Sequence, residues 1–225
     1  MKKITTIFTI LMSILIISCG QKTQETPANT DNAADHSQHS TANAHAGHTS
    51  ESEIMNLMHA PMMEQAFQKT ANIDADFLVN MIPHHEGAIL SSRKLLETTT
   101  NEQLITLANN IISAQEQEVM EFSQLITELN AQNISYEDID TQAVGNEMEA
   151  LMNTMMEKMA AVEITGNNDI DFIRGMIEHH QGAVDVSKKI LEYTKNMKIK
   201  EIANRIITAQ EKEIKDMNDM LNSIA

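Results

Sequence analysis

Two pairs of adjacent histidines interrupt apolar stretches of this sequence, and each pair follows a methionine by three and four residues. The two groups are Met81, His84 and His85 in "MIPHHEGAIL", and Met176, His179 and His180 in "MIEHHQGAVD". Residues three and four apart lie on one face of a helix, so each group places a thioether beside two imidazoles. A thioether suits Cu(I) or Ag(I) but is a poor ligand for Zn²⁺, Fe or Mg²⁺.

The surrounding periodicity predicts that these histidines are buried. Apolar residues recur at helical spacing through residues 76–97, and the histidines fall on that apolar face. The inner faces of two later helical segments are interrupted in a matching way, by Gln115, Glu118, Gln210 and Glu213. Burying such groups unpaired costs several kcal/mol. A structural polar network, metal ligation and a redox or acid–base site would each satisfy them, and all three explanations remain open.

Methionine-rich segments precede both histidine motifs and supply further candidate ligands. The chain has 17 methionines and no tryptophan. Methionine at helical spacing commonly serves as a flexible core residue, although leucine or isoleucine would fill a plain core better. These segments are therefore core, ligand, or both. Their candidates are Met55, Met58, His59, Met62 and Met63 in the first segment, and Met152, Met155, Met156 and Met159 in the second.

An internal repeat organises the elements that carry these residues. Residues 76–97 align without a gap on residues 171–192, and residues 107–122 align on 202–217 at the same offset. From residue 51 onward the pattern is helical and contains no convincing strand, which predicts an all-α fold. Each repeat consists of a short helix, a long helix and a second long helix.

The repeats are expected to span 51–130 and 143–225, together forming one helical bundle over 51–225. The link between the two long helices of each repeat is only a few residues, so these helices should be antiparallel neighbours. The middle of one then meets the middle of the other, which brings the histidines opposite the Gln and Glu residues. Asp74 and Asp169 are the expected N-caps of the histidine-bearing helices.

The N-terminal fifth of the chain has a different character. Residues 1–18 combine two lysines with a short apolar run and read as a secretory signal peptide. The "IISC" ending resembles the lipobox of bacterial lipoproteins, which implies that Cys19 is lipidated and anchors the chain to a membrane. Residues 19–50 are polar and predict a disordered tether. The tether carries a secondary set of metal candidates: His36, His39, His45 and His48.

Charge and cysteine content exclude several functions. The formal net charge is −16, and it becomes −18 without residues 1–18, which contain two lysines and no acids. Such a chain repels nucleic acid. Cys19 is the single cysteine, so neither an intramolecular disulfide nor a thiolate metal site can form. No nucleophile–base arrangement or Gly-rich phosphate loop is visible, so no enzymatic activity is predicted.

The Met-x-x-His-His-x-Gly-Ala block, paired in both halves with an Ala-Gln-x-x-Glu block, resembles the bacterial family known as domain of unknown function 305. The resemblance covers the chain from about residue 57 to residue 221. It implies a ferritin-like four-helix bundle outside the cytoplasm, and some family members are periplasmic proteins that bind copper and protect against it. By motif, the implied ligands are the two Met-His-His groups.

We therefore expect an envelope-anchored, periplasm-facing copper-binding lipoprotein for copper tolerance, storage or transfer, in either the inner or the outer membrane. Cu(I) or Ag(I) suits the Met and His ligands, and Cu(II) suits the tether. A copper efflux system or copper chaperone is the expected protein partner. One alternative is a metal-free helical interaction module with a buried His–Glu network. A ferritin-like redox enzyme is less favoured, because neither histidine-bearing helix contains Glu-x-x-His.

Overall fold

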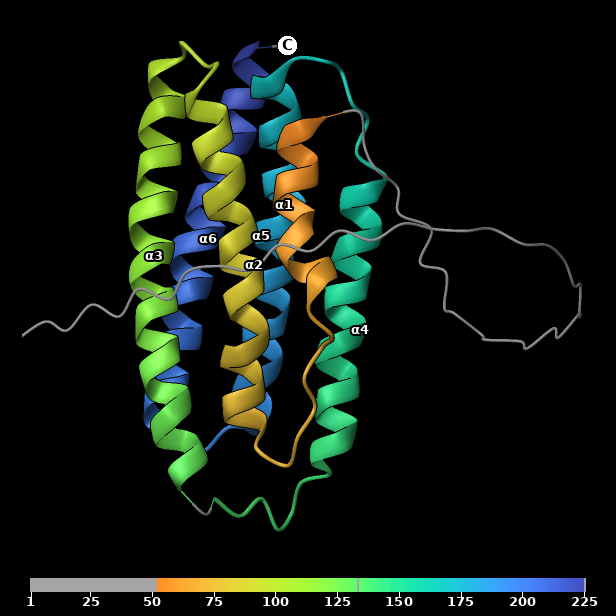
Figure 1. Ribbon diagram of the computed structural model, residues 1–225, viewed down its shortest axis with the longest axis vertical. Helices are drawn as coiled ribbons and strands as arrows, with labels where there is room; N and C mark the ends of the chain where they lie inside the picture. The colour runs from red at the N-terminus through yellow and green to blue at the C-terminus, as the bar shows by residue number, and fades with distance from the viewer. Residues whose placement is uncertain (1–51, 133, 225) are drawn as a thin grey trace, which may run out of the picture. The chain divides into compact units, whose positions relative to one another are not determined.

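The computed structural model describes residues 52–132 and 134–224 and contains six helices within them (Figure 1). The expected signal peptide, Cys19 and the His-rich tether lie outside the described residues. The helices are α1 (Glu53–Glu64), α2 (Ile73–Leu96), α3 (Glu102–Ala131), α4 (Thr141–Ala160), α5 (Asn168–Tyr193) and α6 (Met197–Ile224). No strand occurs in this part of the chain, and the predicted all-α bundle is confirmed.

Four long helices, α2, α3, α5 and α6, form the body of the bundle. The α2 helix packs on α3, α5 packs on α6, and α2 also contacts α5. The short links 97–101 and 194–196 make α2 and α3, and likewise α5 and α6, antiparallel neighbours, as expected. The α1 helix packs against both α2 and α5, and α4 packs mainly on α5 (Figure 1).

The two central helices begin earlier than the sequence suggested. The side chain of Asn72 accepts a hydrogen bond from the amide of Ala75 at 3.1 Å, and Asn167 caps α5 in the same way. The prediction that Asp74 and Asp169 are the N-caps is therefore wrong, because both residues lie inside the first turn of their helix. An acidic side chain there is still favourable, since it faces the positive end of the helix dipole.

The aspartates two residues further along, Asp76 and Asp171, fix the loops that precede these helices. The carboxylate of Asp76 accepts hydrogen bonds from the Thr70 amide at 2.6 Å and the Thr70 hydroxyl at 2.9 Å. Asp171 does the same for Thr165, at 2.8 Å and 2.7 Å. Each helix start is thus tied to the chain before it, which sets where the following histidines fall.

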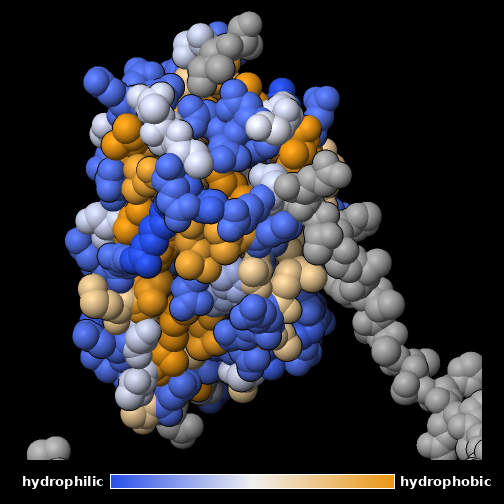
Figure 2. All heavy atoms as spheres, turned by 45° about the horizontal axis from the view of Figure 1, so that its top comes forward, coloured by the Kyte–Doolittle hydropathy of each residue, from blue (hydrophilic) through white to orange (hydrophobic). Residues whose placement is uncertain are grey.

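The core is mainly apolar, with the four histidines buried near the middle of α2 and α5. Phe77, Phe122 and Phe172 are fully buried with many aliphatic and methionine side chains. The face seen in Figure 2 carries hydrophilic residues around an apolar area. Within the described residues, none of the helices has both the length and the apolar character needed to cross a membrane.

Candidate metal centre

All four imidazoles of the histidine pairs lie inside the bundle. Helix α2 carries His84 and His85, α5 carries His179 and His180, and all four residues are 0% exposed. The contact between α2 and α5 brings the two pairs together. The rings of His84 and His179 stack with their centroids 3.7 Å apart and their planes 34° from parallel. The sequence predicted that the histidines are buried, but not that the pairs meet across the repeat.

The outer histidine of each pair is held by a glutamate from the neighbouring long helix. His85 Nε2 lies 2.8 Å from Glu118 Oε2 on α3, and His180 Nε2 lies 2.8 Å from Glu213 Oε2 on α6. This contact places the middle of each histidine helix against the middle of its antiparallel neighbour, as predicted. Histidines that bind metals commonly donate their second ring N–H to a carboxylate in this way.

The two glutamates differ in their second partner. Arg205 on α6 donates to Glu118 Oε1 at 3.1 Å and also contacts Glu121, so it links the α3 and α6 helices. Burial alone would raise the pKa of Glu118, but the hydrogen bond from His85 and the Arg205 guanidinium together lower it. The position that matches Arg205 in the first repeat is Asn110, which carries no charge. The two His–Glu pairs are therefore not equivalent.

Five ring nitrogens in this centre have no hydrogen-bond partner within the described residues. They are the Nδ1 atoms of His84, His85, His179 and His180, together with Nε2 of His179. A neutral imidazole that donates through Nε2 carries its lone pair on Nδ1. His84 Nε2 donates to the backbone carbonyl of His179 at 2.9 Å, which leaves its Nδ1 as an acceptor without a donor. Unsatisfied buried polar atoms of this kind are rare and call for an explanation such as a bound ion.

Burial keeps the stacked pair uncharged. It lowers the pKa of His84 well below the ordinary range, and the neighbouring His85 lowers it further. Burial likewise lowers the pKa of His179 well below that range, and the facing His84 adds to the effect. A neutral imidazole is the form that binds metal ions, so the site is ready to accept a cation without first releasing a proton.

His179 lies between two glycines of α5 that make room for methionine side chains. A Cβ atom at Gly175 would come within 2.4 Å of Met55 Sδ and 3.4 Å of Met58 Sδ. At Gly182 it would come within 2.4 Å of Met155 Sδ. Gly175 and Gly182 stand four residues before and three residues after His179, on the same helical face. Three thioethers thus lie along the strip of α5 that carries an imidazole with two unpartnered nitrogens.

A third glycine brings α1 close to the same ring. A Cβ at Gly87 would lie 2.2 Å from the backbone oxygen of Met58 and 3.5 Å from His179 Nε2. The α1 backbone can approach α2 this closely only because Gly87 has no side chain. Sequence reasoning missed all three glycines as parts of the site. Glycine inside a strong helical pattern is the signal that could have found them.

The methionine candidates differ in how far their side chains are buried. The buried ones are Met55, Met58, Met81, Met152, Met155, Met159 and Met176. Met62, Met156 and His59 are partly buried. Burial also lowers the pKa of His59, whose Nε2 has no partner within the described residues.

Met63 contradicts the expected buried stripe, because it is 51% exposed. At 3.6 residues per turn it lies about 80° around α1 from Met55, at the edge of the apolar face. It also precedes the last residue of the helix, Glu64. Met63 therefore does not reach the centre with the other methionines of α1.

Comparison with known proteins places the chain in a family. The model for domain of unknown function 305 matches residues 18–126 and 74–221. The chain belongs to the DUF305 family. An uncharacterised protein, L153 of Acanthamoeba polyphaga mimivirus, is 42% identical over 55 residues, and the match spans 36% of that protein's length.

Solved structures of DUF305-like proteins resemble the bundle. CopM in its Cu(I)-bound form is 27% identical, with a TM-score of 0.50, over 67% of this chain and 96% of CopM. CopM in its Cu(II)-bound form gives 26% identity and a TM-score of 0.51 over 68% of this chain and 97% of CopM. A DUF305 fragment from Deinococcus radiodurans is 19% identical, with a TM-score of 0.50 over 69% and 99% of the two chains, and shows the same fold.

The donor set of this DUF305 chain favours a soft ion. Among the described residues, no three His, Asp or Glu side chains are grouped so that one ion could be held by all of them. A hard ion such as Mg²⁺, which requires several oxygen ligands, does not fit. The donors that lie along this part of α5 are imidazole nitrogens and thioether sulfurs, a combination that suits Cu(I) or Ag(I).

Proposed function

We propose that this chain is an envelope-anchored copper-binding lipoprotein that holds Cu(I) through Met and His ligands. Ag(I) would substitute for Cu(I), and Cu(II) is a second cargo. The role is copper tolerance, storage or transfer rather than catalysis. The observation that carries the proposal is His179: its ring is fully buried, both of its nitrogens lack partners in the described residues, and three thioethers lie along its helix face.

His179, His84 and the nearby thioethers of Met55, Met58 and Met155 are the proposed centre. His85 and His180 are further nitrogen donors, and Glu118 and Glu213 would orient them. The buried Met81 and Met176 complete the candidate set. A bound copper ion would take up the lone pair of an unpartnered nitrogen, which costs about 1–3 kcal/mol when it is buried without a partner.

The CopM structures support the choice of metal. CopM was solved with Cu(I), Cu(II) and Ag bound, and it resembles this chain over two thirds of its length. The Met-x-x-His-His motif occurs twice in the present sequence, so this chain carries the same kinds of soft donor in both halves.

Anchoring rests on the sequence of the N-terminal segment. The signal peptide and the "IISC" motif support lipidation at Cys19, with the protein facing the periplasm. The tether histidines would then offer a second, weaker site for Cu(II) outside the bundle. A copper efflux system or a copper chaperone is the proposed partner in transfer.

A metal-free interaction module is the second candidate function. The His85–Glu118 and His180–Glu213 contacts favour it, because a structural network would contain them too. That candidate leaves the five unpartnered nitrogens unexplained. It also predicts that copper does not change the melting temperature, whereas a ligand that binds only the folded state must raise it.

The decisive experiment is titration of the purified protein with Cu(I) against a chromogenic Cu(I) chelator at neutral pH. The proposal expects binding tighter than about 1 μM, that is, more than about 8 kcal/mol. The variant with His84, His85, His179 and His180 all changed to alanine should lose it. Unchanged binding in that variant, while it remains folded by circular dichroism, would refute the proposed centre.

A further inference from the structure

One groove on the outer surface is lined by exposed apolar side chains. Four large apolar residues are exposed among those described: Met63, Leu90, Met120 and Met197. Leu90, 38% exposed, and Met120, 59% exposed, line a groove of about 920 Å³ that runs over α2 between α1 and α3. Glu64 of α1 also lines the groove, whereas its neighbour Met63 does not. An apolar groove between helices is a surface on which an amphipathic helix can bind.

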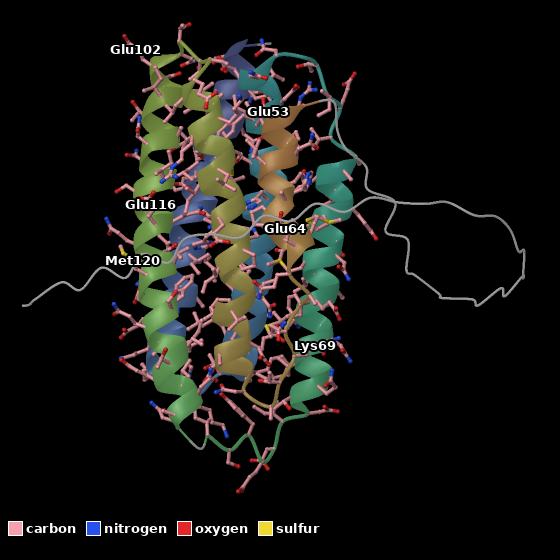
Figure 3. The ribbon with its side chains drawn as sticks, in the orientation of Figure 1. Glu53, Glu64, Lys69, Glu102, Glu116 and Met120 are labelled. Carbon is pink, nitrogen blue, oxygen red and sulfur yellow. The ribbon has the colours of Figure 1, made fainter. Side chains whose placement is uncertain are left out.

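The rim of this groove is acidic. Figure 3 labels Glu64 on α1 and Glu116 and Met120 on α3, with α2 between them. Glu86 of α2 also lines the groove, and Arg93 is its single basic lining residue. Arg93 is already paired with Glu116. Neither Glu64 nor Glu86 has an ion-pair partner within the described residues, so the groove presents unneutralised negative charge beside an apolar floor.

The second repeat offers an internal comparison, because its matching surface is built differently. At the repeat offset, Leu90 corresponds to Asp185, and Met120 corresponds to Lys215. These polar side chains are engaged locally: Gln181 donates to Asp185 at 2.8 Å, and Lys215 pairs with Asp219 at 2.5 Å. The matching pair of Arg93 and Glu116 is kept as Lys188 and Glu211, 2.7 Å apart. The two exposed apolar side chains, Leu90 and Met120, are thus specific to the first repeat and are not a requirement of the bundle.

We propose that this groove docks an amphipathic helix of a partner protein whose apolar stripe is flanked by lysine or arginine. A helix lying in a groove between helices is a recurring recognition mode, and the acidic rim would steer and orient a basic partner. A second copy of this chain is a poor occupant, because its net charge of −16 would repel the rim. An anionic membrane surface is disfavoured for the same reason.

The groove is on the outside of the same turn of α2 that carries the candidate metal ligands. Glu86 is exposed, and the residue before it, His85, is fully buried. A partner bound in the groove would therefore sit one helix thickness from the copper centre. The inference goes beyond copper binding and does not depend on it, since neither Leu90 nor Met120 is a proposed ligand.

The test uses a fluorescent synthetic helix with a leucine stripe flanked by lysines, and a matched helix with glutamates in place of the lysines. Fluorescence anisotropy should show that the purified protein binds the lysine helix and that added salt weakens the binding. Leu90→Asp combined with Met120→Lys replaces the two exposed apolar residues by those at the matching positions of the second repeat, and it leaves the net charge unchanged. This variant should bind about tenfold more weakly, because the central apolar anchors are lost.

Met197→Lys is the matched control, since Met197 is 66% exposed but lies at the start of α6, away from the groove. It should bind like the wild type. A second variant, Glu64→Gln with Glu86→Gln, keeps the apolar floor and should lose much of the salt dependence. Copper binding should be unchanged in all variants, which separates failure of this inference from failure of the copper proposal.

Three results would overturn the inference. One is equal binding of the lysine helix by the wild type and the Leu90→Asp, Met120→Lys variant. Another is equal binding of the lysine and glutamate helices. The third is a concentration-dependent dimer in sedimentation that the double variant abolishes, because a second copy would then occupy the groove.

Discussion

The imidazoles of His84 and His179 stack at 3.7 Å between centroids, although 95 residues separate them in the chain. The pair is not symmetric. His84 donates to the backbone carbonyl of His179, whereas neither ring nitrogen of His179 has a partner in the described residues. Two protonated rings at this distance would repel strongly, so the stack requires neutral imidazoles. In the proposed function, a soft cation would bind in the plane of a ring, at the lone pair of an unpartnered nitrogen.

The first prediction concerns pH and the metal-free protein. Because burial lowers the pKa of both stacked histidines, the unfolded chain binds protons near pH 6.5 while the folded chain does not. Stability is therefore complete above the unfolded pKa and is lost as pH falls below it, by up to about 1.4 kcal/mol per pH unit for each histidine. Urea unfolding between pH 7.5 and 5 measures this slope.

The control is the His84→Gln, His179→Gln variant. Its free energy of unfolding should change less with pH over the same range. The same control carries an opposing effect that both proteins share, because burial raises the pKa of Asp74 and of Asp76. Each of those carboxyls binds its proton more readily in the folded state, which adds stability at lower pH. A wild-type curve that is flat from pH 7.5 to 5 would contradict the buried neutral pair.

The second prediction separates core methionine from ligand methionine. Met81→Leu with Met176→Leu conserves volume at two fully buried positions, so the free energy of unfolding should change by less than about 1.5 kcal/mol per site. If the thioethers bind Cu(I), its affinity should fall by about tenfold or more, because leucine has no donor atom. Chelator competition measures the affinity. Met217→Leu, equally buried on α6 but outside the candidate set, should leave it unchanged.

The third prediction concerns the glutamates that hold the outer histidines. Glu118→Gln or Glu213→Gln removes the carboxylate that His85 or His180 contacts at 2.8 Å. Loss of such an orienting group should weaken copper binding by about 10–100-fold. Glu116→Gln is the matched control on α3, since Glu116 pairs with Arg93 on the surface. If both glutamate variants bind copper as tightly as the wild type, the two His–Glu pairs are not part of the copper site.

The fourth prediction tests the close approach of α1 to the histidine helix. A methyl group at Gly87 would meet the backbone oxygen of Met58 at 2.2 Å, so α1 must move. Gly87→Ala should lower the free energy of unfolding by about 3 kcal/mol in urea denaturation. Gly175→Ala meets the flexible ends of the Met55 and Met58 side chains instead, and should cost about 1 kcal/mol because those ends can rotate away. Equal costs would show that the two glycines do not differ in this way.

Local pattern in the sequence was enough to predict much of this protein. Helical periodicity indicated an all-α fold, and the short links predicted antiparallel neighbours. The positions of His84, His85, Gln115 and Glu118 on inner faces correctly predicted that α2 and α3 meet at mid-height. These features follow from which face of a helix is apolar, and that face is fixed by spacing along the chain.

Contacts between distant segments were decided by the tertiary structure. Spacing could not indicate that His84 stacks on His179, that Arg205 reaches Glu118, or that methionines of α1 and α4 lie against glycines of α5. The predictions from spacing were also wrong about the two N-caps and about the burial of Met63. Periodicity specifies the direction in which a side chain points but not the helix it meets, because that depends on how all six helices pack together.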